Sequence, residues 1–249
     1  VPLRADSTLT PPYLMQPFVL GADLLYHSAT KFLGGHGTAI GGFIVDSGRF
    51  DWEASGKFPQ LTAPYAGFHN MDFEEESGTR AFLLRARREG LRDFGACMAP
   101  MNAFQILQGI ETLHLRMPRH VENARAVVKF LAENPMVESV GYPELESHPD
   151  NALARKLLPK GCGAVFSFNM KGGRAAGKRF IESLRIFSHL ANVGDAKSLV
   201  IHPASTTHQQ LTREQQLSTG VTEDFIRLSV GLEHIDDIIA DLDQALAAS

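Results

Sequence analysis

The hydrophobic positions change their period part-way along the chain. In the first part, short apolar runs stand beside glycines, and Leu24–Tyr26 and Gly41–Asp46 are the clearest of them. Apolar runs of this length, bounded by turn residues, are typical of buried strands in a parallel sheet. Residues 47–75 mix Gly, Pro, Asp and aromatic residues without a period, which predicts a long irregular excursion.

A helical stripe follows. Apolar residues recur there at steps of three or four, and Asn134-Pro135 ends the pattern. We expect a bend or a restart near Pro118, because proline interrupts the helical hydrogen bonds. A helix of this length is a natural bridge between two domains, so we divide the chain into residues 1–113 and 114–249. The stripe consists of Phe104, Leu107, Ile110, Leu113, Met117, Val121, Ala124, Val128 and Leu131.

The last part of the chain indicates an α+β unit. Ala164–Met170 predicts a strand, and a helix is expected around Ala175–Leu184. Phe225–Val230 alternates with a period of two, which places Arg227 on the face opposite the apolar residues. Ile235–Leu246 repeats its apolar residues at helical spacing and predicts a closing amphipathic helix.

Composition excludes several classes of protein. With 249 residues, of which 44% are hydrophobic and 21% charged, the chain fits an ordinary globular protein rather than a disordered one. The net charge of −4 gives no basic surface for a nucleic acid partner. No apolar run approaches the ~20 residues that cross a bilayer, so we expect no membrane partner. The two cysteines, Cys97 and Cys162, are too few for a disulfide framework and favour a reducing cytoplasm.

Lys31 is the first candidate for chemistry. It precedes the glycines of residues 34–37, which excludes the phosphate-binding Walker motif, where lysine follows the glycines. A lysine that is partly removed from water loses proton affinity and can form an imine with an aldehyde. The hydroxyls of Ser28 and Thr30 could then bind a phosphate on that aldehyde. Taken alone, the pattern also fits an ordinary surface lysine after a strand.

Asp6 ends the run Val1–Ala5, as a carboxylate at the carboxyl edge of a sheet would. Ligands of open α/β sheets bind at that edge. A carboxylate beside a pyridine nitrogen keeps such a ring protonated and able to accept electrons. The alternative is an aspartate that stabilises a turn before Ser7-Thr8. We predict no metal site, because no His-Glu-x-x-His motif and no Cys/His cluster occurs.

Several segments together resemble one enzyme family. Asp23–Gly37 resembles the pyridoxal-phosphate attachment signature of the Cys/Met-metabolism enzymes. Asp6–Thr8 with Pro12–Leu14, His202–His208 and Arg227–Glu233 resemble further segments of that family, so the resemblance covers essentially the whole chain. It implies an α/β fold: the C-terminal part of a fold-type-I transferase large domain, with a mostly parallel sheet, followed by a smaller α+β domain.

The resemblance also implies roles for the candidates. Lys31 corresponds to the lysine that forms a Schiff base with pyridoxal 5'-phosphate and moves protons. Asp6 corresponds to the partner of the pyridine nitrogen, and Ser28 and Thr30 to the side chains that hold the phosphate.

Two further residues correspond to the substrate site of the family. Arg227 matches the arginine that clamps the α-carboxylate of the substrate, a task suited to a planar bidentate donor. Asn192 falls where the family has a second carboxylate contact. On sequence pattern alone, Arg227 would be an ordinary surface ion-pair residue.

Residues 49–76 resemble the O-acetylhomoserine sulfhydrylase branch, whose reaction belongs to methionine and cysteine metabolism. The implied reaction is γ-replacement: acetate leaves an O-acylated homoserine, and sulfide or a thiol takes its place. Cystathionine γ-synthase or methionine γ-lyase activity remains an alternative, as does a catalytically incomplete fragment or partner subunit.

The chain starts at Val1 without a methionine. We therefore expect the C-terminal part of a longer enzyme whose upstream part carries the remaining cofactor contacts. The family further implies a homo-oligomer, a tetramer built from dimers, whose active sites are shared between subunits.

Overall fold

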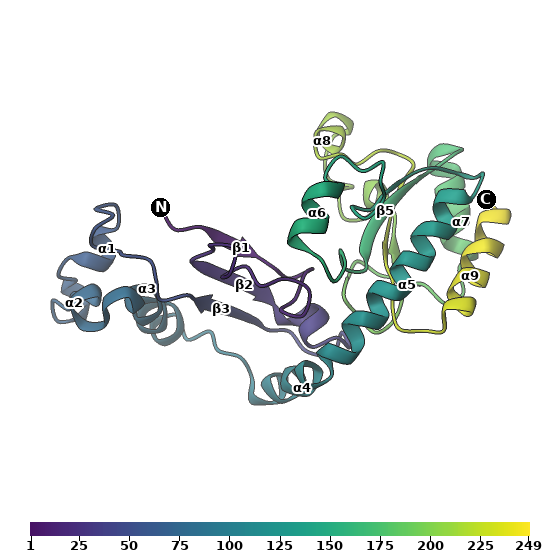
Figure 1. Ribbon diagram of the computed structural model, residues 1–249. Coiled ribbons are helices and arrows are strands. Elements are labelled where there is room, and N and C mark those ends of the chain that lie inside the picture. The colour runs from purple at the N-terminus through teal and green to yellow at the C-terminus, as the bar shows by residue number, and fades with distance from the viewer.

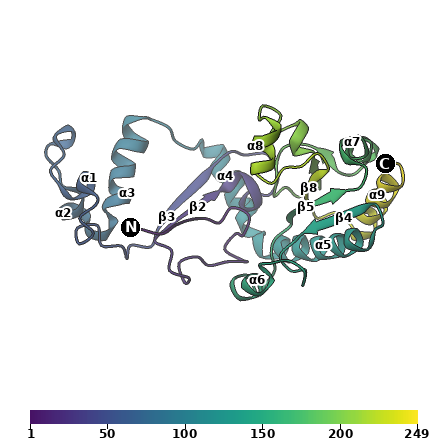
Figure 2. The same ribbon diagram turned by 90° about the horizontal axis from the view of Figure 1, so that it is seen from above.

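Two β-sheets organise the chain, and the computed structural model describes all of it, residues 1–249. The N-terminal sheet has the order β1-β2-β3, and the C-terminal sheet has the order β4-β5-β8-β7-β6. Figure 1 shows the small sheet between a group of short helices at one end and the larger sheet at the other. Seen from above, the molecule is again elongated (Figure 2). The α/β fold class is thereby confirmed.

The N-terminal sheet comprises β1 (Arg4–Asp6), β2 (Leu24–Ser28) and β3 (Gly42–Asp46). β1 and β2 are parallel, so Asp6 and Ser28 lie toward the same edge of the sheet. The prediction of a buried parallel strand at 41–46 is wrong in its direction and burial. β3 pairs antiparallel with β2, because the chain returns to the free edge of β2 without a long crossover. It is the edge strand of this sheet and is largely exposed.

The excursion after β3 is mostly irregular over residues 47–75, as predicted, with short helical turns in it, and it continues as a run of short helices from Phe73 to Asp93. Trp52 is buried there among the rings of Phe50, Phe58 and Phe82, and its indole N–H donates to the carbonyl of Thr79 at 2.9 Å. Aromatic clusters of this kind form without any period in the sequence. The elements are α1 (Pro59–Thr62), η2 (Ala66–Phe68), α2 (Phe73–Ser77), η3 (Gly78–Arg80), α3 (Ala81–Arg85) and η4 (Ala86–Asp93).

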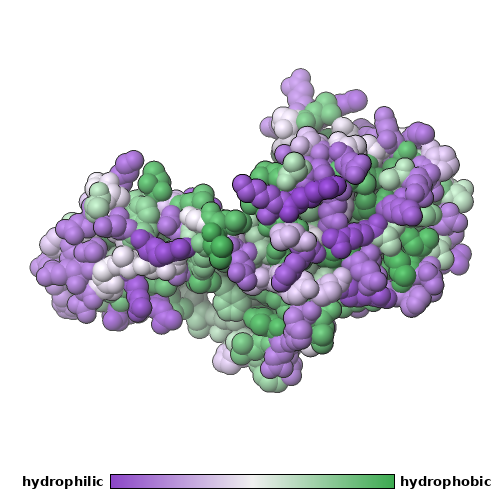
Figure 3. Space-filling model, viewed as in Figure 1, coloured by the Kyte–Doolittle hydropathy of each residue, from purple (hydrophilic) through white to green (hydrophobic).

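The predicted helical stripe forms two helices, α4 (Pro100–Glu111) and α5 (Leu113–Glu133). The restart lies at Thr112, not at Pro118, which is exposed and lies within α5, where water can reach the carbonyl that proline leaves unpaired. Phe104 and Leu107 of the predicted stripe lie in α4, where they are 56% and 59% exposed. They face away from the buried side of α4, and Figure 3 shows apolar surface over this helix.

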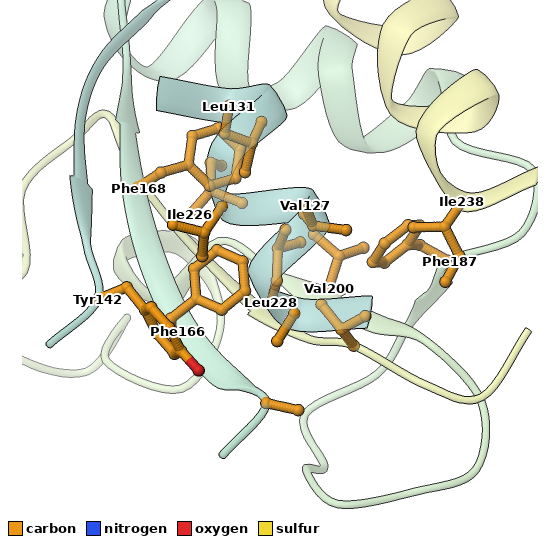
Figure 4. Packing of buried hydrophobic residues seen from close by; sticks show 14 of the residues in the cluster. Val127, Leu131, Tyr142, Phe166, Phe168, Phe187, Val200, Ile226, Leu228 and Ile238 are labelled. Atoms are coloured by element: carbon orange, nitrogen blue, oxygen red, sulfur yellow. The ribbon is translucent and has the colours of Figure 1, made fainter. Parts of the chain in front are cut away.

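The C-terminal sheet is covered by α5, α7 (Gly173–Ser183) and α9 (Ile235–Ala247), which pack against one another and the sheet. Figure 4 shows Phe168, Ile226 and Leu131 pointing into the core between them. The predicted strands and helices of this part are all confirmed. The other elements are β4 (Val137–Gly141), α6 (Asn151–Leu157), β5 (Val165–Met170), β6 (Ser188–His189), β7 (Leu199–Ile201), η5 (Pro203–Ser205), α8 (Arg213–Ser218) and β8 (Phe225–Ser229).

No helix has both the length and the apolar character needed to cross a membrane. No group of three or more His, Cys, Asp or Glu side chains is arranged to hold a metal ion.

Candidate functional site

Lys31 lies in a wide helical turn, η1 (Ala29–Leu33), that directly follows β2. The backbone of Lys31 leaves the helical region, with φ −91° and ψ −133°. Ala29 and Phe32 on either side are fully buried and belong to the main hydrophobic core. The backbone around the lysine is therefore anchored by its neighbours, while Lys31 itself stays half-buried.

A chain of hydrogen bonds joins Lys31 to two residues that are distant in sequence. Its Nζ donates to Oδ1 of Asn192, and Nη2 of Arg227 donates to the backbone carbonyl of Asn192 at 3.1 Å. Burial lowers the pKa of Lys31, and the positive charge of Arg227 lowers it further. Burial also lowers the pKa of Arg227. The result is an amine that is easier to deprotonate, close to a fixed guanidinium.

The other candidates lie at the carboxyl edge of β1 and β2. Oδ1 of Asp6 accepts from the backbone N–H of Thr8 at 2.9 Å, and no basic side chain forms a salt bridge with it. Thr8 also accepts from the backbone N–H of Ser28 at 2.8 Å, which links the ends of the two strands. The hydroxyl of Thr30 is bound to the backbone of Gly41, at 3.1 Å from its N–H and 3.3 Å from its carbonyl. The Ser28 hydroxyl has no such partner within the chain.

The sequence did not show the close approach of Gly194 to Phe32, which brings Asn192 beside Lys31. Gly194 has φ +74°, and a Cβ there would lie 2.7 Å from the backbone nitrogen of Phe32. Only glycine therefore lets the loop after Asn192 approach the Lys31 segment. The N–H of Gly194 donates to Oγ of Ser229 at 2.9 Å, which ties the same loop to β8.

Buried polar residues on α5 were also missed. The guanidinium of Arg116 donates to the carbonyls of Phe32 and Leu33, directly after Lys31. The sequence signal was available: Arg116, His120 and Asn123 recur at helical spacing beside the apolar stripe.

Comparison with known proteins agrees with this geometry. The family described as Cys/Met metabolism PLP-dependent enzyme matches residues 1–247. The chain belongs to this family. Its relatives include the O-acetyl-L-homoserine sulfhydrylase of Leptospira meyeri, 53% identical over 99% of this chain and 58% of the relative. The homocysteine synthase of Schizosaccharomyces pombe is 54% identical over the same shares, 99% and 58%. The chain thus spans about 58% of the length of these relatives.

A solved structure has the same fold as this chain. An O-acetylhomoserine (thiol)-lyase from Campylobacter jejuni, which contains a pyridoxyl-lysine phosphate group, superposes with a TM-score of 0.92. The two are 38% identical, and the match covers 99% of this chain and 59% of that one.

The side chains present here fit pyridoxal phosphate by their chemistry. An amine with a lowered pKa suits an aldehyde, and a carboxylate with no basic partner suits a pyridine nitrogen. A hydroxyl without a protein partner, that of Ser28, suits a phosphate oxygen. All three groups lie on, or directly after, two adjacent parallel strands.

Proposed function

We propose that the protein containing this chain catalyses γ-replacement on an O-acylated homoserine. O-Acetylhomoserine reacts with sulfide or a thiol and yields homocysteine or a thioether, with acetate as the leaving group. The observation that carries the proposal is the hydrogen-bonded chain Lys31–Asn192–Arg227. It couples an amine of lowered pKa to a group that recognises carboxylate, which a pyridoxal-phosphate enzyme acting on amino acids requires.

The residues divide between cofactor and substrate. Lys31 would hold the cofactor through its aldehyde, Asp6 would keep the pyridine nitrogen protonated, and Ser28 would hold the phosphate. Thr30 would contribute to the phosphate site only if its O–H, which donates to the carbonyl of Gly41 at 3.3 Å, turned to the phosphate; the N–H of Gly41 would still bind its oxygen. When bound, the cofactor supplies a conjugated ring that accepts electrons from the carbon under attack.

Arg227 and Asn192 act on the substrate in this proposal. Arg227 would bind the α-carboxylate through its guanidinium, and the Nδ2 group of Asn192 would add a donor, since Lys31 engages only Oδ1 of that side chain. This places the α-carbon of the amino acid beside Nζ of Lys31. The deprotonated amine of Lys31 would accept the α-proton at Nζ, and a lowered pKa keeps this amine available as a base.

The names of the relatives support the sulfhydrylase branch, and so does the long excursion between β3 and α4. We further propose a cytoplasmic homotetramer with active sites shared between subunits. Within the chain we propose a domain boundary between residues 113 and 114, beside the helix break at Thr112.

The test is an assay of the purified full-length protein with O-acetylhomoserine. Homocysteine formed only when sulfide is present supports the proposal. Release of a keto acid and ammonia without any thiol would instead assign a γ-lyase. Lys31→Ala should abolish turnover, whereas Lys171→Ala, which removes an exposed lysine bound to the carbonyl of Pro135, should not. Full activity in Lys31→Ala would overturn the assignment of the site.

A further inference from the structure

Three buried polar side chains lie on the inward face of α5. Arg116, His120 and Asn123 are 7%, 0% and 0% exposed. Their spacing of four and three residues places them in one row along the helix. Burying polar groups costs free energy unless they find hydrogen-bond partners, so their partners indicate what the row holds.

Arg116 binds the backbone that directly follows Lys31. Nη1 donates to the carbonyl of Phe32 at 2.9 Å, and Nη2 donates to that of Leu33 at 3.3 Å. Nη2 also donates to the carbonyl of Gly109 at 2.6 Å, and Nε to Oγ1 of Thr112 at 3.0 Å. No carboxylate forms a salt bridge with this guanidinium. Its contacts are with backbone carbonyls and one hydroxyl, which makes it a clamp on the Lys31 segment rather than an ion-pair member.

The other two residues bind the backbone directly after β8, the strand of Arg227. Nδ1 of His120 donates to the carbonyl of Val230 at 2.8 Å. Nδ2 of Asn123 donates to the carbonyls of Gly231 and Glu233, both at 3.0 Å. The ring of His120 also packs edge-on against the ring of Phe32, with 5.1 Å between their centroids. His120 therefore touches both segments.

We propose that Arg116, His120 and Asn123 are positioning residues that fix the Lys31 segment and the end of β8 on one helix face, and so set Nζ of Lys31 relative to the Arg227 guanidinium. This rests on the proposed function, in which the amine and the guanidinium hold the same substrate. None of the three side chains needs to touch that substrate.

The same two segments are joined on their other side by the loop of Asn192. The N–H of Ala196 donates to the carbonyl of Gly35 at 2.9 Å, and Gly194 is bound to Ser229 as described above. The Lys31 segment is thus held between this loop and α5. Loosening the α5 contacts frees the lysine backbone on one side, exposes its amine to water and draws it away from Arg227.

The experiment compares two Arg→Lys variants on the same helix in the full-length protein. Arg116→Lys keeps the charge but loses the fork of hydrogen bonds to Phe32 and Leu33. Arg125→Lys is the matched control, because Arg125 forms a two-point pair with Glu144 on the outer side of α5, at 2.6 and 3.2 Å. The readout is pyridoxal 5'-phosphate attached to Lys31, trapped with borohydride, quantified by peptide mass, and measured across pH.

In Arg116→Lys, the pH midpoint of adduct formation should rise toward that of an ordinary lysine. The value of kcat/KM should fall by about 10- to 100-fold, as expected when reacting groups are misplaced by around 1 Å. In Arg125→Lys both should stay at the wild-type values. If Arg116→Lys does not fold, Asn123→Ser provides the same comparison. An unchanged midpoint in the Arg116 or Asn123 variant, even with a lower melting temperature, would overturn the positioning role. Wild-type protein without any adduct would overturn the proposed function itself.

Discussion

Replacing Gly109 by alanine tests how closely α4 packs against the lysine segment. Gly109 is buried within the helix, and a Cβ there would overlap the carbonyl oxygen of Gly34 and lie 2.6 Å from that of Leu33. Both neighbours are backbone atoms of the segment that carries Lys31. They can move only if that segment moves.

Two effects of opposite sign decide the outcome. Alanine stabilises a helix interior by about 1 kcal/mol relative to glycine. Overpacking a filled site typically costs about 1–3 kcal/mol, and here the upper part of that range applies because the neighbours are rigid. We therefore expect the free energy of unfolding to fall by about 2 kcal/mol. This corresponds to a melting temperature roughly 4–8 °C lower.

Thermal or urea unfolding of the full-length protein measures the change. Gly90→Ala is the matched control, because Gly90 lies in the helical segment η4 and a Cβ there meets nothing within 4 Å. That variant should gain up to about 1 kcal/mol. A Gly109→Ala protein as stable as wild type, or more stable, would refute the packing argument.

Substitutions at three other residues test charged or titratable groups that the fold holds in place. Arg227→Gln should raise the pKa of Lys31, seen as a higher pH midpoint for its reaction with an aldehyde, whereas Arg227→Lys keeps the charge and should change it much less. Asp241→Asn should cost about 1.5–3 kcal/mol in urea unfolding, because this buried carboxylate accepts from backbone N–H groups at the end of α7. Burial lowers the pKa of His120 to about 4. As the pH falls below about 6.5, His120 therefore becomes protonated in the unfolded chain while it stays neutral in the folded chain. Between pH 6.5 and pH 4, the free energy of unfolding of the wild type should therefore fall by roughly 3 kcal/mol. His120→Phe has no group that titrates there and should lack this part of the decline.

The sequence predicts best what depends on neighbouring residues. The lysine with its two hydroxyls, the alternation that exposes Arg227 on one face of β8, and the closing helix are all local patterns. The structure joins Lys31 to Arg227 through Asn192, as a shared site requires, although the roles of these residues stay predictions.

Patterns that depend on tertiary contacts were predicted less well. A run such as 41–46 is apolar in either strand direction, so its composition could not show that β3 is antiparallel and exposed. The apolar stripe joined two helices into one, because Phe104 and Leu107 keep a helical spacing although they face outward. The helical spacing of Arg116 beside the apolar stripe was visible in the sequence, but its partners were not, since they are carbonyls more than 80 residues earlier.

The position of Trp52 gives the molecule an internal optical probe. It is the only tryptophan of the chain, and it lies in the small aromatic cluster of the excursion rather than in the main core. Its emission therefore reports the environment of residues 50–82, whereas circular dichroism reports mainly the helices packed on the C-terminal sheet. If the two signals change at different urea concentrations, the excursion unfolds separately from the C-terminal sheet that carries Arg227, and the unfolding is not two-state.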